Sequence, residues 1–339
     1  MALPTPNQAP PFDITRASHV VLDVSDLAES RRFYEDLVGL VVTAARPDAL
    51  YLRGVEEACH HSVVLRRAAE PGCRRIGFRV RRDADLHVAK RWFERRGLQA
   101  RFVDRPFQGR TLHVTDVAGT PLELVARMPT VPRAISTFDT FKGAAPAGLD
   151  HHVVELADVG ALNRMYAALG FRISEYLTLD GTPDTPLVGA FMGRKGNATD
   201  LGILMNEGPR MHHFSCVVRD AASTMMRVCD IAGALDYGSN VESGPARHGA
   251  IGTRFVFLRD PDGHRIELTS ASYQLIDPEV APVGWAASDP TAAIAFGAPA
   301  PAAWFNDAMR FTGVATAEPD MNRIVARPAP PAHARALER

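Results

Sequence analysis

A short apolar strand pattern followed by an amphipathic helix pattern occurs at two places in the chain, 18–42 and 150–173. In each copy a histidine opens a run rich in β-branched residues, an aspartate follows seven residues later, and a tyrosine follows eight residues after that. This order predicts a strand, an aspartate N-cap, a helix with its tyrosine packed inward and a glycine exit. The residues are His19, Asp26 and Tyr34 in the first copy, and His151, Asp158 and Tyr166 in the second.

Two further segments, 76–98 and 213–235, carry a weaker version of this pattern, and each is followed by a matching closing strand. The closing strands read DVAGTPLEL over 116–124 and DPDGHRIEL over 260–268. Asp-Pro-Asp-Gly is typical of a tight turn, and the alternating polarity after it is typical of a strand. Aspartate, glycine and glutamate occupy the same offsets in both, at Asp116, Gly119 and Glu123 and at Asp260, Gly263 and Glu267.

This repetition predicts an α+β fold of four βαβββ modules paired into two domains, 14–130 and 145–275. The length of 339 residues suits two domains. The Pro-rich start, 1–13, and the end, 326–339, are expected to be loose termini.

Three candidate metal ligands fall at equivalent positions of the second domain. His151 lies seven residues before Asp158, and His213 lies seven residues before Asp220. Two imidazoles and the carboxylate of Glu267, held on three strands, are the set that binds Fe(II) or Mn(II) with positions left open. A lone glutamate on a strand is more often solvent-facing, and a lone histidine is more often a core or surface group. The equivalent placement of all three favours a metal site.

Both histidines belong to doublets, and the period of a strand lets only one residue of each doublet face the barrel. We therefore expect His152 and His212 to point to the opposite face of the sheet. The first domain keeps His19 and Glu123, but Ile76 stands where the second histidine would be. That domain is expected to bind metal poorly and to be a structural relic of duplication.

The four-module arrangement resembles the vicinal oxygen chelate superfamily and, within it, the type I extradiol ring-cleaving dioxygenases. The resemblance to the homoprotocatechuate 2,3-dioxygenase branch runs through the stretches GPRMHHFSC, CDIAGAL, ESGPARHGAIGTRFVFLRDPDGHRIEL, DPEVAPVGW and FGAPAPAAWF. It implies half-open barrels, an Fe(II) or Mn(II) cofactor, and a small aromatic diol cleaved with O2. It also implies a homo-oligomer, dimer or tetramer, and a C-terminal extension, 276–325, that packs across the barrel mouth.

The resemblance further implies roles for residues around the metal. His248 matches a histidine that hydrogen-bonds the substrate oxygen, and Phe191 matches an aromatic that flanks bound oxygen or substrate. Thr199 and Asp200 occupy the position of an acid–base His-Asp pair. A threonine hydroxyl can relay or donate a hydrogen bond but cannot act as a base near pH 7.

Other pocket positions also depart from that branch. Phe257 replaces a tyrosine and so lacks its hydrogen-bond donor, and Val153 replaces an asparagine. The two arginines that bind an acidic side chain of the substrate fall at Ser243 and Ala293. The loss of both cations predicts a catechol without a carboxylate side chain.

Because the metal ligands match while the proton-transfer residues do not, alternatives to the ring-cleaving function stay open. One is a metalloenzyme on the same scaffold with isomerase- or lyase-type chemistry. Another is a relative that binds a phenol without turnover, which would bind the ligand and consume no oxygen.

Composition limits the possible partners and the cellular location of the protein. The net charge of −1 gives no basic surface for nucleic acid, and no apolar run is long enough to cross a membrane. The four cysteines form no CxxC pair, and the start lacks a secretion-signal pattern, so a cytoplasmic location is expected. His60 and His61 are expected at the surface, and His264 is expected to project outward from its turn.

Overall fold

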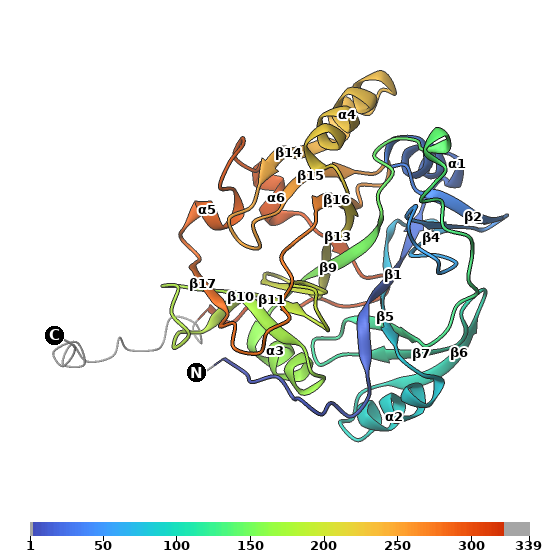
Figure 1. Ribbon diagram of the computed structural model, residues 1–339. Helices are drawn as coiled ribbons and strands as arrows, with labels where there is room; N and C mark the ends of the chain where they lie inside the picture. The colour runs from blue at the N-terminus through green and yellow to red at the C-terminus, as the bar shows by residue number, and fades with distance from the viewer. Residues whose placement is uncertain (1–2, 322–339) are drawn as a thin grey trace.

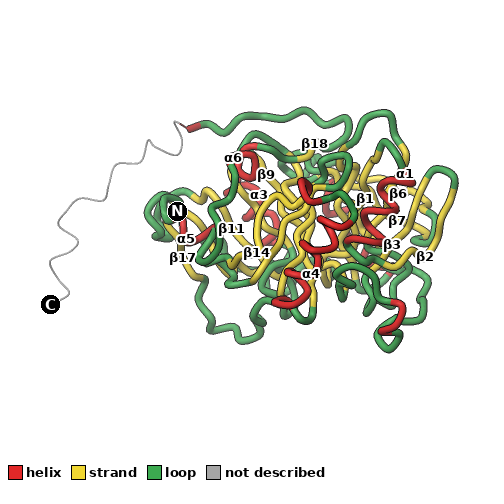
Figure 2. Tube along the Cα trace, turned by 90° about the horizontal axis from the view of Figure 1, so that it is seen from above, coloured by secondary structure: helices red, strands yellow, loops and turns green. Residues whose placement is uncertain are grey.

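The computed structural model describes residues 3–321 and places two strand-rich domains side by side (Figure 1 and Figure 2). The first domain contains, in chain order, β1 (Ile14–Val24), α1 (Leu27–Arg31) continued by a π-helix (Arg32–Leu37), β2 (Val41–Arg46), β3 (Ala49–Arg53), β4 (Val63–Arg67), β5 (Gly72–Val80), α2 (Asp83–Glu94), β6 (Ala100–Arg105), β7 (Gly109–Thr115) and β8 (Pro121–Val125).

After a connector with a 3₁₀ turn (Phe138–Thr140), the second domain repeats the order. It contains β9 (Gly148–Leu156), α3 (Val159–Ala168), β10 (Arg172–Thr178), β11 (Leu187–Gly193), β12 (Leu201–Met205), β13 (Arg210–Val218), α4 (Ala221–Ala234), a 3₁₀ turn (Gly238–Asn240), β14 (Val241–Arg247), β15 (Arg254–Arg259) and β16 (Arg265–Ser270). The C-terminal segment adds β17 (Val283–Ala286), α5 (Pro290–Ala293), α6 (Ala302–Asn306) and β18 (Met309–Arg310).

Each domain is one sheet built from two βαβββ modules, which confirms the expected fold class. The strand order is β2-β3-β4-β1-β5-β8-β7-β6 in the first sheet and β14-β15-β16-β13-β9-β12-β11-β10-β17 in the second. The first strands of paired modules run antiparallel at the sheet centre, and each module's last strand pairs parallel with its first. First and closing strands, which carry the candidate ligands, are therefore neighbours.

The predicted strand–aspartate–helix order is confirmed in the two strong copies of the repeat. Asp26 accepts backbone N–H groups of the first turn of α1, and Asp158 accepts the N–H of Ala161 at the start of α3. Tyr34 and Tyr166 are fully buried, so the aromatic face of each helix packs against its sheet.

The first domain's weaker copy is shifted by one residue from the expected alignment. Helix α2 begins at Asp83 with Arg82 at the N-cap, whereas α4 begins at Ala221 with Asp220 at the N-cap. Asp83 and Asp220 are therefore not equivalent positions, which changes the residue that corresponds to His213.

One continuous hydrophobic cluster runs through both domains. The N-terminal segment joins it, because Phe12 is buried against the rings of Trp92 and Phe93. Asp13 forms ion pairs with Arg81 of the first domain and with residues of the second. The end of the segment expected to be loose, Phe12 and Asp13, is thus anchored to the domains, and 326–339 lie outside the described residues.

The C-terminal segment is tied to the second sheet at two points. Strand β17 pairs parallel with β10 at one edge, and β18 pairs antiparallel with β13 in the centre. The residues between these strands pass along the second domain, as Figure 1 shows for α5 and α6. No helix within residues 3–321 is long and apolar enough to cross a bilayer.

Candidate metal centre

Strand register brings the three expected ligands together. His151 on β9 and Glu267 on β16 both pair with Ser215 on the intervening strand β13. His213 lies two residues before Ser215 and therefore projects from the same face of the sheet. Three neighbouring strands thus present two imidazoles and one carboxylate to a single point.

The distances among these groups suit a shared cation. Ligand atoms of His151, His213 and Glu267 all lie within 4.8 Å of one another. Oε2 of Glu267 is 3.4 Å from Nε2 of His151 and 3.6 Å from Nε2 of His213. Glu267 is 2% exposed, and its Oε2 has no hydrogen-bond partner among the described residues. A buried carboxylate oxygen without a donor, facing two imidazole nitrogens, fits Fe(II) or Mn(II).

Hydrogen bonds on the far side of each ring leave the Nε2 lone pairs free for a metal. Nδ1 of His151 lies 2.7 Å from Oδ2 of Asp150, so its N–H donates to that carboxylate. A carboxylate in this place fixes the ring orientation and raises the basicity of the ligand. Asp150 was not among the expected site residues, although it directly precedes a candidate ligand.

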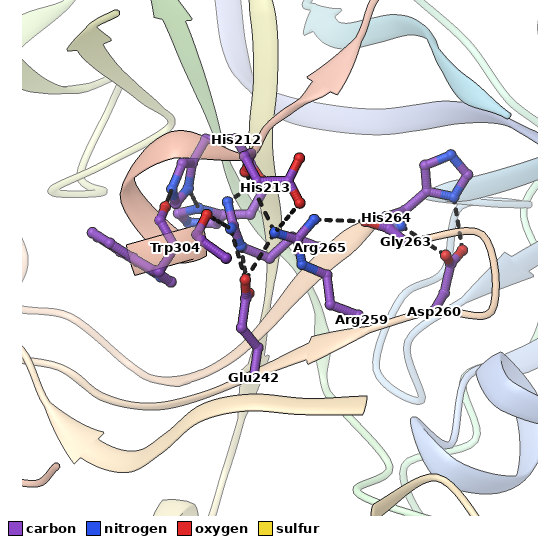
Figure 3. Close-up of polar contacts among 11 residues, drawn as sticks. His212, His213, Glu242, Arg259, Asp260, Gly263, His264, Arg265 and Trp304 are labelled. Atoms are coloured by element: carbon purple, nitrogen blue, oxygen red, sulfur yellow. Dashed lines mark hydrogen bonds and ion pairs between the residues drawn. The ribbon is translucent and has the colours of Figure 1, made fainter. Parts of the chain in front are cut away.

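His213 is oriented by its own neighbour. Nε2 of His212 lies 2.8 Å from the carbonyl oxygen of Trp304, so His212 donates there and its Nδ1 is left as an acceptor. That Nδ1 is 2.6 Å from Nδ1 of His213, which must then be the donor. Figure 3 shows the ring of His212 between His213 and Trp304. His213 therefore turns its Nε2 lone pair toward Glu267.

The expected exclusion of His212 from the barrel is wrong. A register shift between Met211 and His213 breaks the strict alternation of β13, and His212 lines the same cavity as His213. His152 behaves as expected, because it is fully buried and its Nε2 lies 3.4 Å from the carbonyl oxygen of Gly77 in the first domain. A β-bulge inserts one extra residue into one strand, here His212. Its position depends on pairing with the neighbouring strand, so the strand period alone does not predict it.

The charge states prepare the centre for a cation. Burial lowers the pKa of His213 to about 4, so this ring is neutral near pH 7 and able to ligate. Burial raises the pKa of Glu267, but the facing imidazoles of His213 and His248 outweigh it and hold that pKa well below its usual range. For His151 burial lowers the pKa, and the Asp150 carboxylate more than reverses this.

His248 stands on the other side of the carboxylate. Its Nε2 lies 3.3 Å from Oε1 of Glu267, and its Nδ1 donates to the carbonyl oxygen of Ala293. The ring stacks on Phe255 with centroids 3.9 Å apart and planes 16° apart. These contacts fix the ring so that Nε2 faces the metal centre.

Of the Thr199–Asp200 pair, Thr199 faces the cavity and Asp200 lies at the domain interface. Thr199 lines the cavity, and its Oγ1 has no hydrogen-bond partner among the described residues. Asp200 does not line it, because its carboxylate accepts the backbone N–H groups of Ala17 and Arg194. Burial raises the pKa of Asp200 to about 7, but its side chain connects the two domains and does not reach into the cavity.

A cavity of about 740 Å³ opens above the three ligands. Val153, Phe191 and Ala293 line it as expected, whereas Phe257 and Ser243 do not. Phe257 instead packs behind the ligands, with its ring centroid 5.0 Å from that of His213. The C-terminal segment closes one side of the cavity with residues between Ala287 and Phe305.

The first domain has a different arrangement at the equivalent position. Nε2 of His19 lies 3.0 Å from Oε2 of Glu123, and Nε2 of His113 lies 2.9 Å from Oε1. Arg105 and Gln108 also approach this carboxylate, at 3.3 and 3.2 Å. Nitrogens of four side chains thus lie within 3.3 Å of Glu123, although its Oε1, like Oε2 of Glu267, makes no hydrogen bond among the described residues.

The residue equivalent to His213 in the first domain is Arg75, so the expectation of Ile76 is wrong by one position. Val21 pairs with Arg75 as Val153 pairs with His213. By the same register His113, which pairs with Glu123, is the counterpart of Phe257, which pairs with Glu267. A cationic side chain thus occupies the place of the third ligand.

Two surface predictions are wrong. His60 and His61 are 6% and 0% exposed, and Nε2 of His61 lies 3.1 Å from Oε1 of Gln108, inside the first domain. His264 is 1% exposed, and its Nδ1 lies 2.8 Å from Oδ2 of Asp260. His60 and His61 lie inside the first domain, and His264 lies beside Asp260, which contacts Tyr34 of the other domain. The polarity of the neighbouring residues in the sequence does not reveal either contact.

Comparisons with known proteins agree with this geometry. Residues 16–201 match the family described as the Glyoxalase/Bleomycin resistance protein/Dioxygenase superfamily. A manganese-dependent 2,3-dihydroxybiphenyl 1,2-dioxygenase from Geobacillus genomosp. 3 is 25% identical over 289 residues, which cover 80% of this chain and 90% of that protein. A metapyrocatechase from Geobacillus stearothermophilus is 25% identical, with 83% and 89% covered.

A solved structure is similar over most of its length. Homoprotocatechuate 2,3-dioxygenase from Brevibacterium fuscum, in an anaerobic complex with 3,4-dihydroxyphenylacetate, matches with a TM-score of 0.85 and 31% identity. The match covers 91% of this chain and 96% of that chain. Similarity in sequence and similarity in fold therefore indicate the same group of proteins.

Proposed function

The chain belongs to the glyoxalase/bleomycin resistance protein/dioxygenase superfamily, and from this premise we propose that it is a metal-dependent extradiol dioxygenase that opens the ring of a catechol with O2. One observation carries the proposal. His151, His213 and Glu267 converge on one point at the floor of a cavity, and the facing oxygen of Glu267 has no donor among the described residues. The relatives named above are dioxygenases, so isomerase or lyase chemistry and turnover-free phenol binding are not favoured.

His151, His213 and Glu267 would hold Fe(II) or Mn(II), since the ligand set suits both metals. When bound, either metal supplies open coordination positions for the diol and O2. Asp150 and His212 act through their partners, since each fixes the ring of one ligand. The second domain, 145–275, carries the site, and the first, 14–130, is structural.

Proton handling falls to His248. Because its Nδ1–H is committed to the carbonyl oxygen of Ala293, Nε2 is the atom that takes a proton from a substrate hydroxyl and returns it. The hydroxyl of Thr199 lines the cavity and can accept or donate a hydrogen bond to the substrate. Phe191 and Val153 supply apolar walls that keep water away from the ring.

The substrate is a catechol without a carboxylate side chain. Ser243 and Ala293 supply no cation, and no lysine or arginine is found among the described residues that line the cavity. An anionic side chain would lose its hydration without a compensating charge. We also propose that the enzyme works in the cytoplasm and as a homo-oligomer.

Oxygen uptake tests this proposal. The chain is reconstituted with Fe(II) or Mn(II), and catechols, hydroquinones and aminophenols are supplied while oxygen and yellow ring-opened products are monitored. We expect uptake with catechols and none from the Glu267→Gln variant. Stoichiometric bound metal with no uptake for any compound would overturn the proposal.

A further inference from the structure

A buried carboxyl group that the proposed chemistry does not use lies in the same cavity. Glu155 is on β9, four residues after His151 and two after Val153, so the strand period turns all three to one side. It is 3% exposed and lines the cavity. At about 3.3 Å per residue it lies about 13 Å along the strand from the metal ligand. A substituent on a metal-bound catechol would extend toward this distance.

Glu155 is sparsely paired. Among the described residues the one hydrogen bond to its carboxyl group comes from Nδ2 of Asn206, at 3.2 Å from Oε2. The same Nδ2 also donates to the carbonyl oxygen of Phe305, at 3.1 Å. Asn206 and Phe305 line the cavity beside Glu155, so the three residues form one corner of it.

The nearest cations are committed elsewhere. Arg265 is fully buried and holds Glu242 through its Nε and Nη2, at 2.6 and 2.8 Å, as Figure 3 shows. Arg210 forms an ion pair with Glu207. Neither guanidinium is within ion-pair distance of Glu155. A buried carboxyl without an ionic partner is costly to the fold, and burial raises the pKa of Glu155 to about 7.

The other carboxylates of the cavity already have a role, since Glu267 is assigned to the metal and two others are hydrogen-bonded to their neighbours. Glu267 faces the imidazoles, Asp150 accepts from His151, and Asp289 accepts the N–H of Thr291 at the start of α5. Since no lysine or arginine occurs among the described lining residues, Glu155 is the carboxyl in this cavity whose interactions a ligand can complete.

We propose that Glu155 and Asn206 form a subsite for a hydrogen-bond donor at the end of the catechol's substituent, and that a protonated amine is the preferred donor. The inference rests on the proposed function, because the diol held at the metal centre orients the substituent toward β9. An ammonium group would gain a charge-assisted hydrogen bond to a carboxylate in a largely apolar cavity, which is stronger than a neutral bond.

Anaerobic binding to the metal-loaded full chain tests the subsite without requiring turnover. The probes are catechols with a two- or four-carbon chain at position 4 that ends in ammonium, hydroxyl, methyl or carboxylate. We expect the ammonium compound of the better-fitting length to bind at least about 10-fold more tightly than its methyl counterpart, and the carboxylate compound to bind most weakly. Equal affinity for ammonium and methyl compounds at both lengths would overturn the subsite.

Variants of Glu155 test whether this residue causes the preference for ammonium. Glu155→Gln keeps the shape but not the charge, and Glu155→Leu removes both. Each should reduce the ammonium-to-methyl affinity ratio about 10-fold, and Glu155→Gln should keep more of the hydroxyl-to-methyl ratio. Glu279→Gln is the matched control, because Glu279 is exposed and does not line the cavity. An unchanged ratio in both Glu155 variants would contradict the assignment.

The two proposals fail in different ways. Ring opening without a donor preference would leave the dioxygenase standing and overturn the subsite. A clear ammonium preference in binding, with no oxygen uptake from any catechol, would overturn the dioxygenase while supporting the subsite.

Discussion

Glu123 and Glu267 occupy the same position in two domains of the same architecture, yet their surroundings differ. Two imidazoles, a guanidinium and an amide all approach Glu123 within 3.3 Å. Oε2 of Glu267 faces two imidazoles at 3.4 and 3.6 Å and has no donor among the described residues. Four side-chain nitrogens crowd the first carboxylate, although its Oε1 also makes no hydrogen bond among the described residues, whereas the wider spacing at the second leaves room for an ion.

Two of the differences lie at equivalent strand positions. Arg75 and His113 in the first domain stand where His213 and Phe257 stand in the second. Burial raises the pKa of Glu123, but His113 and His19 outweigh it and hold that pKa well below its usual range. The comparison teaches that two histidines beside a carboxylate do not by themselves make a metal centre. The second histidine must stand at the position of His213, where the first domain has Arg75.

Removal of each carboxylate should have opposite consequences for metal binding. Glu267→Gln replaces a ligand and should abolish metal retention and turnover. That loss exceeds the roughly 10- to 100-fold that removal of a ligand's hydrogen-bond partner costs. Glu123→Gln should keep one metal per chain. Metal analysis after gel filtration checks both, and equal loss of metal from the two variants would contradict the asymmetry.

Transplanting the second domain's residues should convert the first domain. Arg75→His combined with His113→Phe restores two histidines, one glutamate and a buried phenylalanine, so a second metal should bind with lower affinity than the first. Isothermal titration with Mn(II) would show the stoichiometry rise from one to two. The control, Arg75→Leu with His113→Phe, lacks the ligand, and a second metal in that variant would sink the explanation.

The equivalent turns at Asp116 and Asp260 also differ between the two domains. Asp260 accepts from the hydroxyl of Tyr34 and from His264, whereas Asp116 has Thr120 in place of that histidine. Oδ2 of Asp116 has no hydrogen-bond partner among the described residues. Burial raises the pKa of Asp116 from 3.8 to about 6, because backbone N–H donors only partly offset it.

The raised pKa of Asp116 makes its contribution to stability pH-dependent. Since the folded state holds this proton more tightly than the unfolded state, the contribution is present at low pH and is lost as pH rises from about 4 to about 6. Asp116→Asn should therefore gain up to about 3 kcal/mol of unfolding free energy over the wild type between pH 4 and 7, at 1.36 kcal/mol per pKa unit.

Urea denaturation at several pH values measures that difference. Thr120→His, which supplies the partner that Asp260 already has, should also flatten the wild-type pH dependence. If both variants follow the wild-type curve, the assignment to Asp116 is wrong.

The smallest expected effect concerns the partner of a ligand. Asp150→Asn removes the charge that raises the pKa of His151, so the acidic limit of metal binding should move to lower pH. At pH 8 the same variant should bind metal about 10- to 100-fold more weakly, because the ring is less basic and less firmly held. A competitive metal titration across pH checks both shifts, and an unchanged acidic limit would contradict the role of Asp150.

The sequence by itself determined the repeat and the ligand types. Helix periodicity, Asp26 and Asp158 at the N-caps and the matched closing strands are local features, so four modules and the ligands on their strands could be read from them. His151, His213 and Glu267 followed because strand period and repeat offset are both short-range properties.

Only the tertiary structure decided what surrounds those ligands. The bulge that turns His212 into the cavity and the shift that places Arg75 opposite Val21 arise from pairing between strands far apart in the sequence. The burial of His61 and the carbonyl of Trp304 that fixes His212 depend on segments that meet only in the fold. Glu155 reads as an ordinary polar strand residue until packing removes it from water. Strand register and side-chain burial depend on contacts between segments far apart in the sequence. Local sequence patterns therefore do not predict them.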